Sequence, residues 1–325
     1  MINDIAKELG VSKTTISRAI SGNGRVSEKT RERILKYIDE IGYIPNAAGR
    51  NLVTTKAKNI AFSMPLNNDS TRSAYFLECL FGVEKRAVEA SYDVLIVGNE
   101  LKPISRVINS RKVDGMVITR NIVGDSALER LALSGIPIVL TGSTSAPNII
   151  QVDYDGRAAY NDLALRLMDM WAGEFGLIVT MKEFPANQTR AQGFTDAVTV
   201  KDRQSPFIEW DADTDDEVYQ AFQKMYNKGI RNIICGDDIV CLELLNVIKG
   251  GGKFESKLDP GKTGHDNINI ASFHSSHYLE TFHPEIPVVQ LDPEKLGDMA
   301  CRMLLQSIDG QKTPMATFLD YNLRI

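Results

Sequence analysis

The sequence predicts an all-α unit over residues 1–45, followed by a larger α/β core built from two lobes, each with a doubly wound parallel sheet. Three observations support this prediction. Apolar residues recur at helical spacing through the first 45 positions, with glycines at the turns between the helical stretches. From Asn59 onward, short apolar runs alternate with amphipathic stretches in two consecutive series. Charge is also segregated, although the 325-residue chain carries only −5 overall.

The segregation of charge indicates two kinds of module. Residues 1–58 hold eleven Lys and Arg against six Asp and Glu, whereas the remaining residues hold 26 against 36. A basic segment joined to an acidic body is typical of a module that meets nucleic-acid phosphates, attached to a module that does not. With 43% hydrophobic and 24% charged residues, both modules are expected to form packed cores.

Several other classes of protein are disfavoured by the sequence. The four cysteines form no C-x-x-C pair, and His274-x-x-His277 has no Cys or acidic ligand beside it at zinc-like spacing, so we expect no disulfide, metal or cofactor. No apolar run reaches the roughly 18 residues that span a bilayer. The first residues lack the basic and apolar parts of a secretory signal. We expect a cytoplasmic protein with no membrane partner.

Three helices are expected in the all-α unit, at residues 3–9, 13–20 and 28–41. Gly10 ends the first helix, because glycine enters a left-handed turn without penalty. Ser12 stands where the N-cap of the second helix belongs. Helix, short turn with glycine, and second helix together are the helix-turn-helix pattern.

The second helix has two chemically different sides. One side is expected to pack on the first helix and carries Thr15, Ile16 and Ala19. The other side is expected to read bases in a major groove and carries Lys13, Thr14, Ser17 and Arg18. Phosphate contacts are expected from polar residues near helix starts and in the linker, namely Ser12, Ser27, Thr30 and Asn46. The base-reading and the phosphate-contacting residues together predict double-stranded DNA as a partner.

A run of short motifs extends across nearly fifty residues: Asp4-Ile5-Ala6, Gly10-Val11-Ser12, Thr15-Ile16-Ser17-Arg18, Val26-Ser27-x-Lys29-Thr30-Arg31 and Gly42-Tyr43-Ile44-Pro45-Asn46. This run resembles the signature of the LacI/GalR family of bacterial transcription regulators. The resemblance implies that Lys13, Thr14 and Arg18 occupy the base-reading positions, and that Arg25 adds a base contact from the following loop.

The segment over residues 46–52 resembles the family's hinge helix. The resemblance implies that Leu52, with Ala48 and Gly49 beside it, enters the minor groove of the operator and kinks the duplex. Taken without the family, residues 46–54 are a plausible linker helix, too short to persist alone in water. Residues 46–58 are therefore expected to form a hinge and linker.

The core from residue 59 to 325 is expected to bind an effector and to dimerise. Its first series of predicted strands is Ile60–Met64, Val94–Val97, Gly115–Thr119, Pro137–Leu140 and Ile149–Val152, with helices at Tyr75–Ala90, Pro103–Ser110 and Ser126–Leu133. The second series has strands at Leu177–Thr180, Phe207–Trp210, Asn232–Cys235 and Ile268–Phe273, helices at Gly156–Met170, Thr189–Val198, Asp216–Asn227 and Asp238–Ile248, and a last strand at Ala316–Tyr321. We expect an N-lobe at residues 59–153 plus 289–314 and a C-lobe at 154–288 plus 315–325.

Enzyme chemistry has no specific support in the sequence. Neither the G-x-G-x-x-G nor the G-x-x-x-x-G-K-[ST] phosphate motif is present, and no Ser/His/Asp set can be argued from spacing. The lobes instead resemble the periplasmic-binding-protein-like core of the same family, through Gly82-Val83-Glu84, Val113-Asp114-Gly115, Gly135-Ile136-Pro137, Val152-Asp153, Arg190-x-x-Gly193-Phe194, Asp237 and Leu296-Gly297. The crevice outside the carboxyl ends of the strands is the expected ligand site.

Six residues are expected at the effector site by position: Tyr75, Phe76, Arg190, Trp210, Asp237 and His274. Packing inside a core is the alternative for Tyr75, Phe76 and Trp210. His274 stands where the family usually has an Asp that accepts hydrogen bonds from sugar hydroxyls. We expect a saccharide effector, and a phosphorylated or acidic compound held by Arg190 and His274 is the alternative.

The sequence thus predicts a homodimeric, DNA-binding regulator, most simply a repressor of carbohydrate-utilisation genes controlled by a small molecule between its lobes. One alternative is a regulator whose main input is a phosphoprotein co-regulator or a non-sugar metabolite. Another is a transport-type solute receptor, which predicts a signal sequence and no basic head. This sequence has a basic N-terminal segment and lacks the features of a signal sequence.

Overall fold

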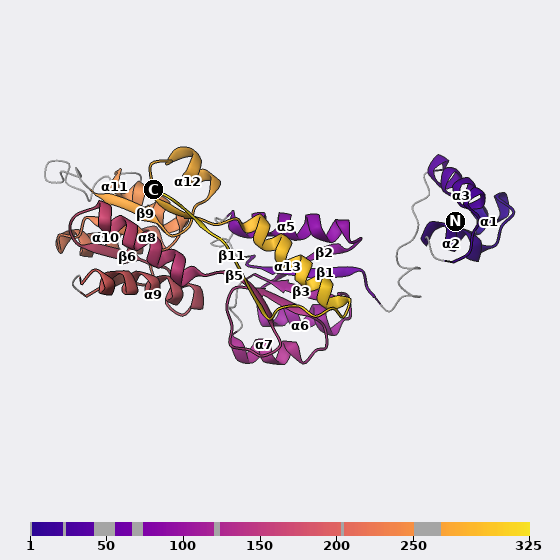
Figure 1. The fold of residues 1–325 in the computed structure, drawn as a ribbon, viewed down its shortest axis with the longest axis horizontal. Coiled ribbons are helices and arrows are strands. Elements are labelled where there is room, and N and C mark those ends of the chain that lie inside the picture. Colours follow the sequence, from indigo (N-terminus) through magenta and orange to yellow (C-terminus); the bar gives the residue numbers. More distant parts are fainter. Residues whose placement is uncertain are drawn as a thin grey trace. The chain divides into compact units, whose positions relative to one another are not determined.

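The chain divides into two compact units, residues 1–57 and 58–325 (Figure 1). The computed structural model describes residues 2–21, 24–41, 56–66, 74–119, 124–202, 205–249 and 268–325. Among the described helices, none combines the length and apolar character needed to cross a membrane.

The first unit is helical, as predicted. Its helices are α1 (Ile2–Glu8), α2 (Lys13–Ser21) and α3 (Glu28–Glu40). One small core holds them together, formed by the buried side chains of Ile5, Ile16, Ala19, Ile34 and Ile38. Because these residues recur at helical spacing on each element, the amphipathic pattern alone determines which sides of the helices meet.

The turn between α1 and α2 depends on Gly10, whose φ of 63° lies in the left-handed region. The N–H of Gly10 donates to Lys7 O at 3.4 Å, and the N–H of Val11 donates to Ala6 O at 3.0 Å. This pair of bonds is the Schellman arrangement, which satisfies carbonyls that the end of a helix leaves without partners. The predicted glycine stop of the first helix is therefore confirmed.

The first lobe of the second unit contains a parallel sheet with the strand order β11-β5-β4-β3-β1-β2. The strands are β1 (Asn59–Met64), β2 (Asp93–Gly98), β3 (Gly115–Ile118), β4 (Ile138–Thr141), β5 (Ile150–Tyr154) and β11 (Ala316–Leu319). Its helices are α5 (Tyr75–Glu89), α6 (Leu101–Asn109), α7 (Asp125–Ala132) and α13 (Pro293–Ile308). Helices α5 and α13 cover one face of this sheet, and α6 and α7 cover the other (Figure 1).

The second lobe has the sheet order β12-β10-β9-β8-β6-β7, in which only β12 runs antiparallel to its neighbour among the described strands. The strands are β6 (Phe175–Ile178), β7 (Phe207–Glu209), β8 (Asn232–Cys235), β9 (Asn269–Ser272), β10 (Val288–Gln290) and β12 (Asn322–Arg324). The helices are α8 (Gly156–Met170), α9 (Pro185–Val200), α10 (Asp215–Asn227), α11 (Asp238–Ile248) and α12 (His277–Phe282). The prediction of two lobes with doubly wound parallel sheets is confirmed.

The predicted lobe boundaries need a correction near the C-terminus. Residues 315–325 were expected in the second lobe, but β11 pairs with β5 of the first sheet, and only β12 joins the second sheet. Strand β10 belongs to the second sheet, although residues from 289 onward were expected in the first lobe. Which sheet a strand joins depends on its pairing with strands far away in the sequence. Local sequence patterns contain no information about that pairing. Helices α12 and α13 and strands β10 and β12 were not predicted from the sequence.

Helices α5 and α13 approach at a pair of glycines. A Cβ atom on Gly82 would lie 1.9 Å from the carbonyl oxygen of Glu294, and one on Gly297 would lie 2.0 Å from that of Cys79. Two backbones therefore touch where any side chain would hold them apart. This contact determines the position of α5, and with it the position of Tyr75 at the start of the helix.

The described chain passes between the lobes at three places, from β5 to α8, from β10 to α13 and from β11 to β12. Tyr154 joins two of these passages. Its hydroxyl donates to Asp292 O at 2.6 Å and accepts from Asp292 N at 2.9 Å. Leu291 and Tyr321 pack against the cores of both lobes. The lobes are therefore joined by tied crossing segments and by shared packing.

Candidate nucleic-acid interface and interlobe site

Helix α2 presents a polar side to solvent. Lys13, Thr14, Ser17 and Arg18 are all exposed. Ile16 is fully buried and Ala19 is 2% exposed, and both lie in the core of the helical unit. The predicted division of this helix into a packed side and an exposed polar side is confirmed. Reading of bases by the four exposed residues stays a prediction.

Two of the serines predicted to contact phosphates cap the helices that they precede. The Ser12 hydroxyl accepts from Thr15 N at 3.0 Å, and the Ser27 hydroxyl accepts from Thr30 N at 3.3 Å. Each hydroxyl also lies against a threonine hydroxyl, at 2.8 Å for Thr15 and 2.7 Å for Thr30. These caps place exposed hydroxyls at the N-termini of α2 and α3, where the helix dipole favours an anion.

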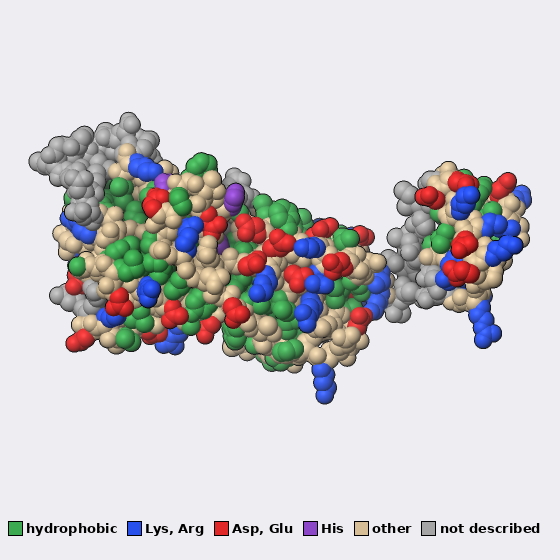
Figure 2. All heavy atoms as spheres, turned by 45° about the horizontal axis from the view of Figure 1, so that its top comes forward, with side chains coloured by type: hydrophobic (Ala, Val, Ile, Leu, Met, Phe, Trp, Pro, Cys, Tyr) green, Lys and Arg blue, Asp and Glu red, His purple; other side chains and the backbone are tan. Residues whose placement is uncertain are grey.

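The other predicted DNA contacts divide into two groups. Arg25 is exposed in the loop before α3. Asn46, Ala48, Gly49 and Leu52 lie outside the described residues. On the face of the helical unit drawn in Figure 2, several Lys and Arg side chains reach the surface, as its basic composition leads one to expect.

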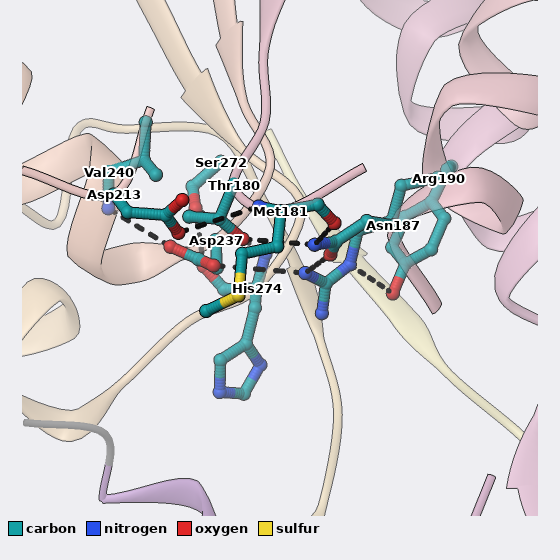
Figure 3. A network of polar contacts seen from close by, with 10 residues as sticks. Thr180, Met181, Asn187, Arg190, Asp213, Asp237, Val240, Ser272 and His274 are labelled. Carbon is teal, nitrogen blue, oxygen red and sulfur yellow. Dashed lines mark hydrogen bonds and ion pairs between the residues drawn. The ribbon is translucent and has the colours of Figure 1, made fainter. Parts of the chain in front are cut away.

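In the second lobe, Arg190 is the centre of a polar network (Figure 3). Its Nη1 donates to Asn187 Oδ1 at 2.9 Å, and its Nε donates to the Tyr160 hydroxyl at 3.4 Å. The Asp237 carboxylate lies 3.8 Å from Nη1, and both side chains are less than one-fifth exposed. Asp237 is held in place because it also caps α11 by accepting from Val240 N at 3.0 Å. The structure thus brings together Arg190 and Asp237, two of the residues predicted at the effector site, and their contact with an effector stays a prediction.

Tyr160 was not predicted from the sequence as part of this network, and neither was Asn187. Asn187 is 2% exposed, and its Nδ2 donates to Thr180 Oγ1 at 3.0 Å and to Met181 O at 2.9 Å. Its bonds therefore tie Arg190 on α9 to the chain that follows β6. Its place three residues before Arg190 was a usable signal, because residues at that spacing share a helix face.

His274 follows β9 and is buried, with 5% of its surface exposed. Burial lowers its pKa from 6.5 to about 4, and the positive charge of Arg190 acts in the same direction, against the opposing effects of Asp237 and Glu280. The ring is therefore neutral at pH 7. Its Nδ1 atom is buried and has no hydrogen-bond partner among the described residues. An orphaned ring nitrogen of this kind is suited to a ligand that exchanges a hydrogen bond with it.

An aromatic contact joins the two lobes at this point. The ring of Tyr75, from α5 of the first lobe, meets the ring of His274 edge-on, with centroids 5.2 Å apart and an interplanar angle of 85°. Phe76, the next residue of α5, is 9% exposed and belongs to the core of the first lobe. Contact of Phe76 with an effector stays a prediction.

Carboxyl groups outnumber Arg190 in this region. Burial raises the pKa of Asp153, at the end of β5, to about 6, although the charge of Arg190 opposes that shift. Burial also raises the pKa of Asp238, which lies within electrostatic range of Arg190, and the pKa of Asp213, which lies within range of Asp237. We call Tyr75, Asp153, Arg190, Asp237 and His274 the interlobe site. Its single described cation is already compensated by neighbouring carboxyls.

Trp210 follows the edge strand β7. It is half-buried against the core of the second lobe, and the Lys182 ammonium lies 5.5 Å from its ring centroid. Its stacking on an effector stays a prediction. A cavity of about 330 Å³ lies over α11 and α12, and none of the predicted effector residues lines it. No group of three or more described His, Cys, Asp or Glu residues is arranged to hold a metal ion.

Both units of the chain match known protein families. Residues 1–46 match the model of the bacterial regulatory proteins of the lacI family, and residues 66–319 match the model of the periplasmic binding proteins and sugar binding domain of the LacI family. The HTH-type transcriptional regulator pepR1 of Lactobacillus delbrueckii subsp. lactis is 26% identical, over 95% of this chain and 91% of its own length. Catabolite control protein A of Priestia megaterium is 26% identical, over 95% and 93%.

Solved structures share the fold. The lac repressor dimer bound to operator and the anti-inducer ONPF aligns with a TM-score of 0.83 at 20% identity, covering 99% of this chain and 97% of the other. The complex of the transcriptional regulator CelR with cellobiose aligns with a TM-score of 0.70 at 21% identity, covering 100% and 98%.

The neutral state of His274 leads to a pH prediction. The native state takes up no proton at this ring until about pH 4, whereas the unfolded chain does so near pH 6.5. Wild-type stability should therefore fall relative to His274→Asn as the pH drops through this window, by up to about 1.4 kcal/mol per pH unit. Urea unfolding of both proteins across the window measures the difference. His277→Asn, at an exposed histidine, is the control. Parallel curves for wild type and His274→Asn would contradict burial of the ring.

Proposed function

This chain belongs to the LacI family of bacterial regulatory proteins, and on that premise we propose that it is a homodimeric transcriptional repressor of carbohydrate-utilisation genes. In this proposal α2 reads operator DNA, and a saccharide bound at the interlobe site changes operator affinity. The observation that carries the DNA-binding part is the exposed polar side of α2, formed by Lys13, Thr14, Ser17 and Arg18 over a buried apolar side.

Sequence reading is tested with an operator selected from randomised duplex DNA using the full-length protein. Arg18→Ala should weaken binding to this operator by about 1–3 kcal/mol and relax the preference at one base pair of each half-site, because arginine holds guanine through two hydrogen bonds. Lys36→Ala is the matched control, since it removes one positive charge from α3, where the side chain is 80% exposed. If Arg18→Ala weakened all duplexes equally, Arg18 would contact phosphate rather than a base.

An apolar surface on the first lobe supports self-association. Leu77, Phe81 and Val88 lie along α5 and are 46%, 60% and 60% exposed, and Ile96 on the edge strand β2 is 54% exposed. In the view of Figure 2, hydrophobic side chains reach the surface in the region of α5. Exposed apolar residues gathered on one helix and a neighbouring sheet edge are typical of a protein interface.

We expect Phe81→Asp to convert a dimer into a monomer in sedimentation-velocity experiments, because the charge would have to be buried without a partner. Leu133→Asp serves as the control, since Leu133 is 86% exposed and follows α7 rather than lying on α5. A Phe81→Asp protein with the sedimentation coefficient of the wild type would mean that α5 is not part of the interface.

Two features of the interlobe site support an uncharged effector. Arg190 already faces Asp237, and His274 is neutral at pH 7, so the pair offers little net positive charge to an anion. Asp153, Asp213 and Asp238 add acidity. Hydroxyl groups, by contrast, can donate to these carboxylates and accept from Arg190. We therefore favour a neutral saccharide over the phosphorylated or acidic alternative.

A thermal-shift screen of mono- and disaccharides and their phosphates tests the effector part. At least one neutral sugar should raise the melting temperature, and Arg190→Ala should weaken its binding by roughly tenfold or more, as expected for hydrogen bonds to a charged group. Arg157→Ala is the control, because Arg157 is paired with Asp196 on the surface of the same lobe. A response to phosphates alone, or silence across the panel, would contradict the neutral-saccharide proposal.

A further inference from the structure

Gly24, in the loop between α2 and α3, lies against the side chain of Arg18. A Cβ atom on Gly24 would be 2.9 Å from Cδ of Arg18 and 3.1 Å from both its Cγ and its Nε. Real Cβ atoms keep larger distances, so the aliphatic stem of Arg18 occupies the space that a side chain at position 24 would need. Gly24 also has a φ of 95°, a conformation that other residues rarely adopt.

Both partners of this contact are anchored to one core. On the α2 side, Ile16 and Ala19 are buried and hold the helix that carries Arg18. On the other side of the loop, Val26 packs against the same core, and Ser27 caps α3. Gly24 and the backbone of Arg18 are therefore held from opposite ends, and their closeness does not depend on a single flexible segment.

We propose that Gly24 is a positioning residue for base reading by Arg18, an inference that rests on the proposed function of α2. The bare backbone at position 24 provides a surface on which the stem of Arg18 lies. An arginine that must align its planar guanidinium with a base edge loses rotamer freedom when it binds. A stem already confined in the free protein loses less, so confinement strengthens binding and sharpens the choice of base.

Gly10 shows that this role is not general to the glycines of the helical unit. Its φ of 63° also lies in the left-handed region, but no atom lies within 4 Å of the place where its Cβ would be. Gly10 is needed for the course of the backbone alone. Gly24 meets the same conformational need and, in addition, leaves room for Arg18.

The test is a double-mutant cycle on the full chain with the selected operator. Gly24→Ala should weaken binding by roughly 2- to 10-fold, because its methyl group takes the space of the stem and forces Arg18 out of the position that it holds in the free protein. The loss should concentrate at the base pair whose preference Arg18→Ala relaxes. In the Arg18→Ala background, Gly24→Ala should have no further effect at that base pair. Gly10→Ala, which strains a turn without touching Arg18, should change all duplexes alike.

Three outcomes would overturn the inference: unchanged binding by Gly24→Ala, a loss spread evenly over all duplexes, or the same loss in the absence of Arg18. In each of these, relaxed base preference in Arg18→Ala alone would leave the proposed function standing. If Arg18→Ala changed no preference, base reading by α2 would itself fail.

A measurement on the wild-type protein tests the inference even if the Gly24→Ala protein does not fold. In the full chain labelled with ¹⁵N-arginine, relaxation of the Nε–H groups reports the order of each arginine side chain. Arg18 should be more ordered than Arg25, which is also exposed and lies in the loop before α3, next to Gly24. Equal mobility of the two side chains in the free protein would overturn the inference.

Discussion

The second unit depends on the three passages by which its described residues cross between the lobes. Tyr154 ties the passage after β5 to the passage before α13 through both polar atoms of the Asp292 peptide. Because three covalent connections leave two bodies few ways to move, a change of lobe orientation has to pivot on these segments. Leu291 and Tyr321 belong to the packing of both lobes and so lie at the pivot. The angle between the lobes at these segments therefore determines which other contacts the lobes make.

The contact between Tyr75 and His274 has a different character, since it joins the lobes without a covalent link. An edge-on aromatic pair contributes about 0.5–1.5 kcal/mol beyond its buried area. A single hydrogen bond to the charged Arg190 is worth about 1.5–3 kcal/mol to a ligand. A ligand that makes such bonds in one lobe arrangement only can therefore outweigh the aromatic contact and shift the equilibrium between arrangements. The orphaned Nδ1 of His274 adds to this sensitivity, because a ligand that satisfies it removes an existing cost.

Features that depend on neighbouring residues could be predicted from the sequence, whereas features that depend on residues far apart could not. The three N-terminal helices, the glycine stop at Gly10 and the exposed side of α2 were predictable, because each depends on residues only a few positions apart. The sheet to which β11 belongs was not, since pairing with β5 joins residues more than 150 positions apart. The same reason separates the site residues. Arg190 and Asp237 were found by motif, whereas the rotation that turns Phe76 into the core is set by the packing of α5 on α13.

The helical unit has a small core, and small cores leave a margin of only a few kcal/mol. Its N-caps at Ser12 and Ser27 are each worth about 1 kcal/mol, a large share of such a margin. The same two hydroxyls were expected to contact phosphates, and the two roles are compatible. A serine hydroxyl that accepts from a backbone N–H keeps its own hydrogen, which it can donate to a phosphate oxygen when the neighbouring threonine donates to it. The groups that hold α2 and α3 in shape are therefore also suited to register them on a duplex, so loss of either cap would disturb folding and DNA docking together.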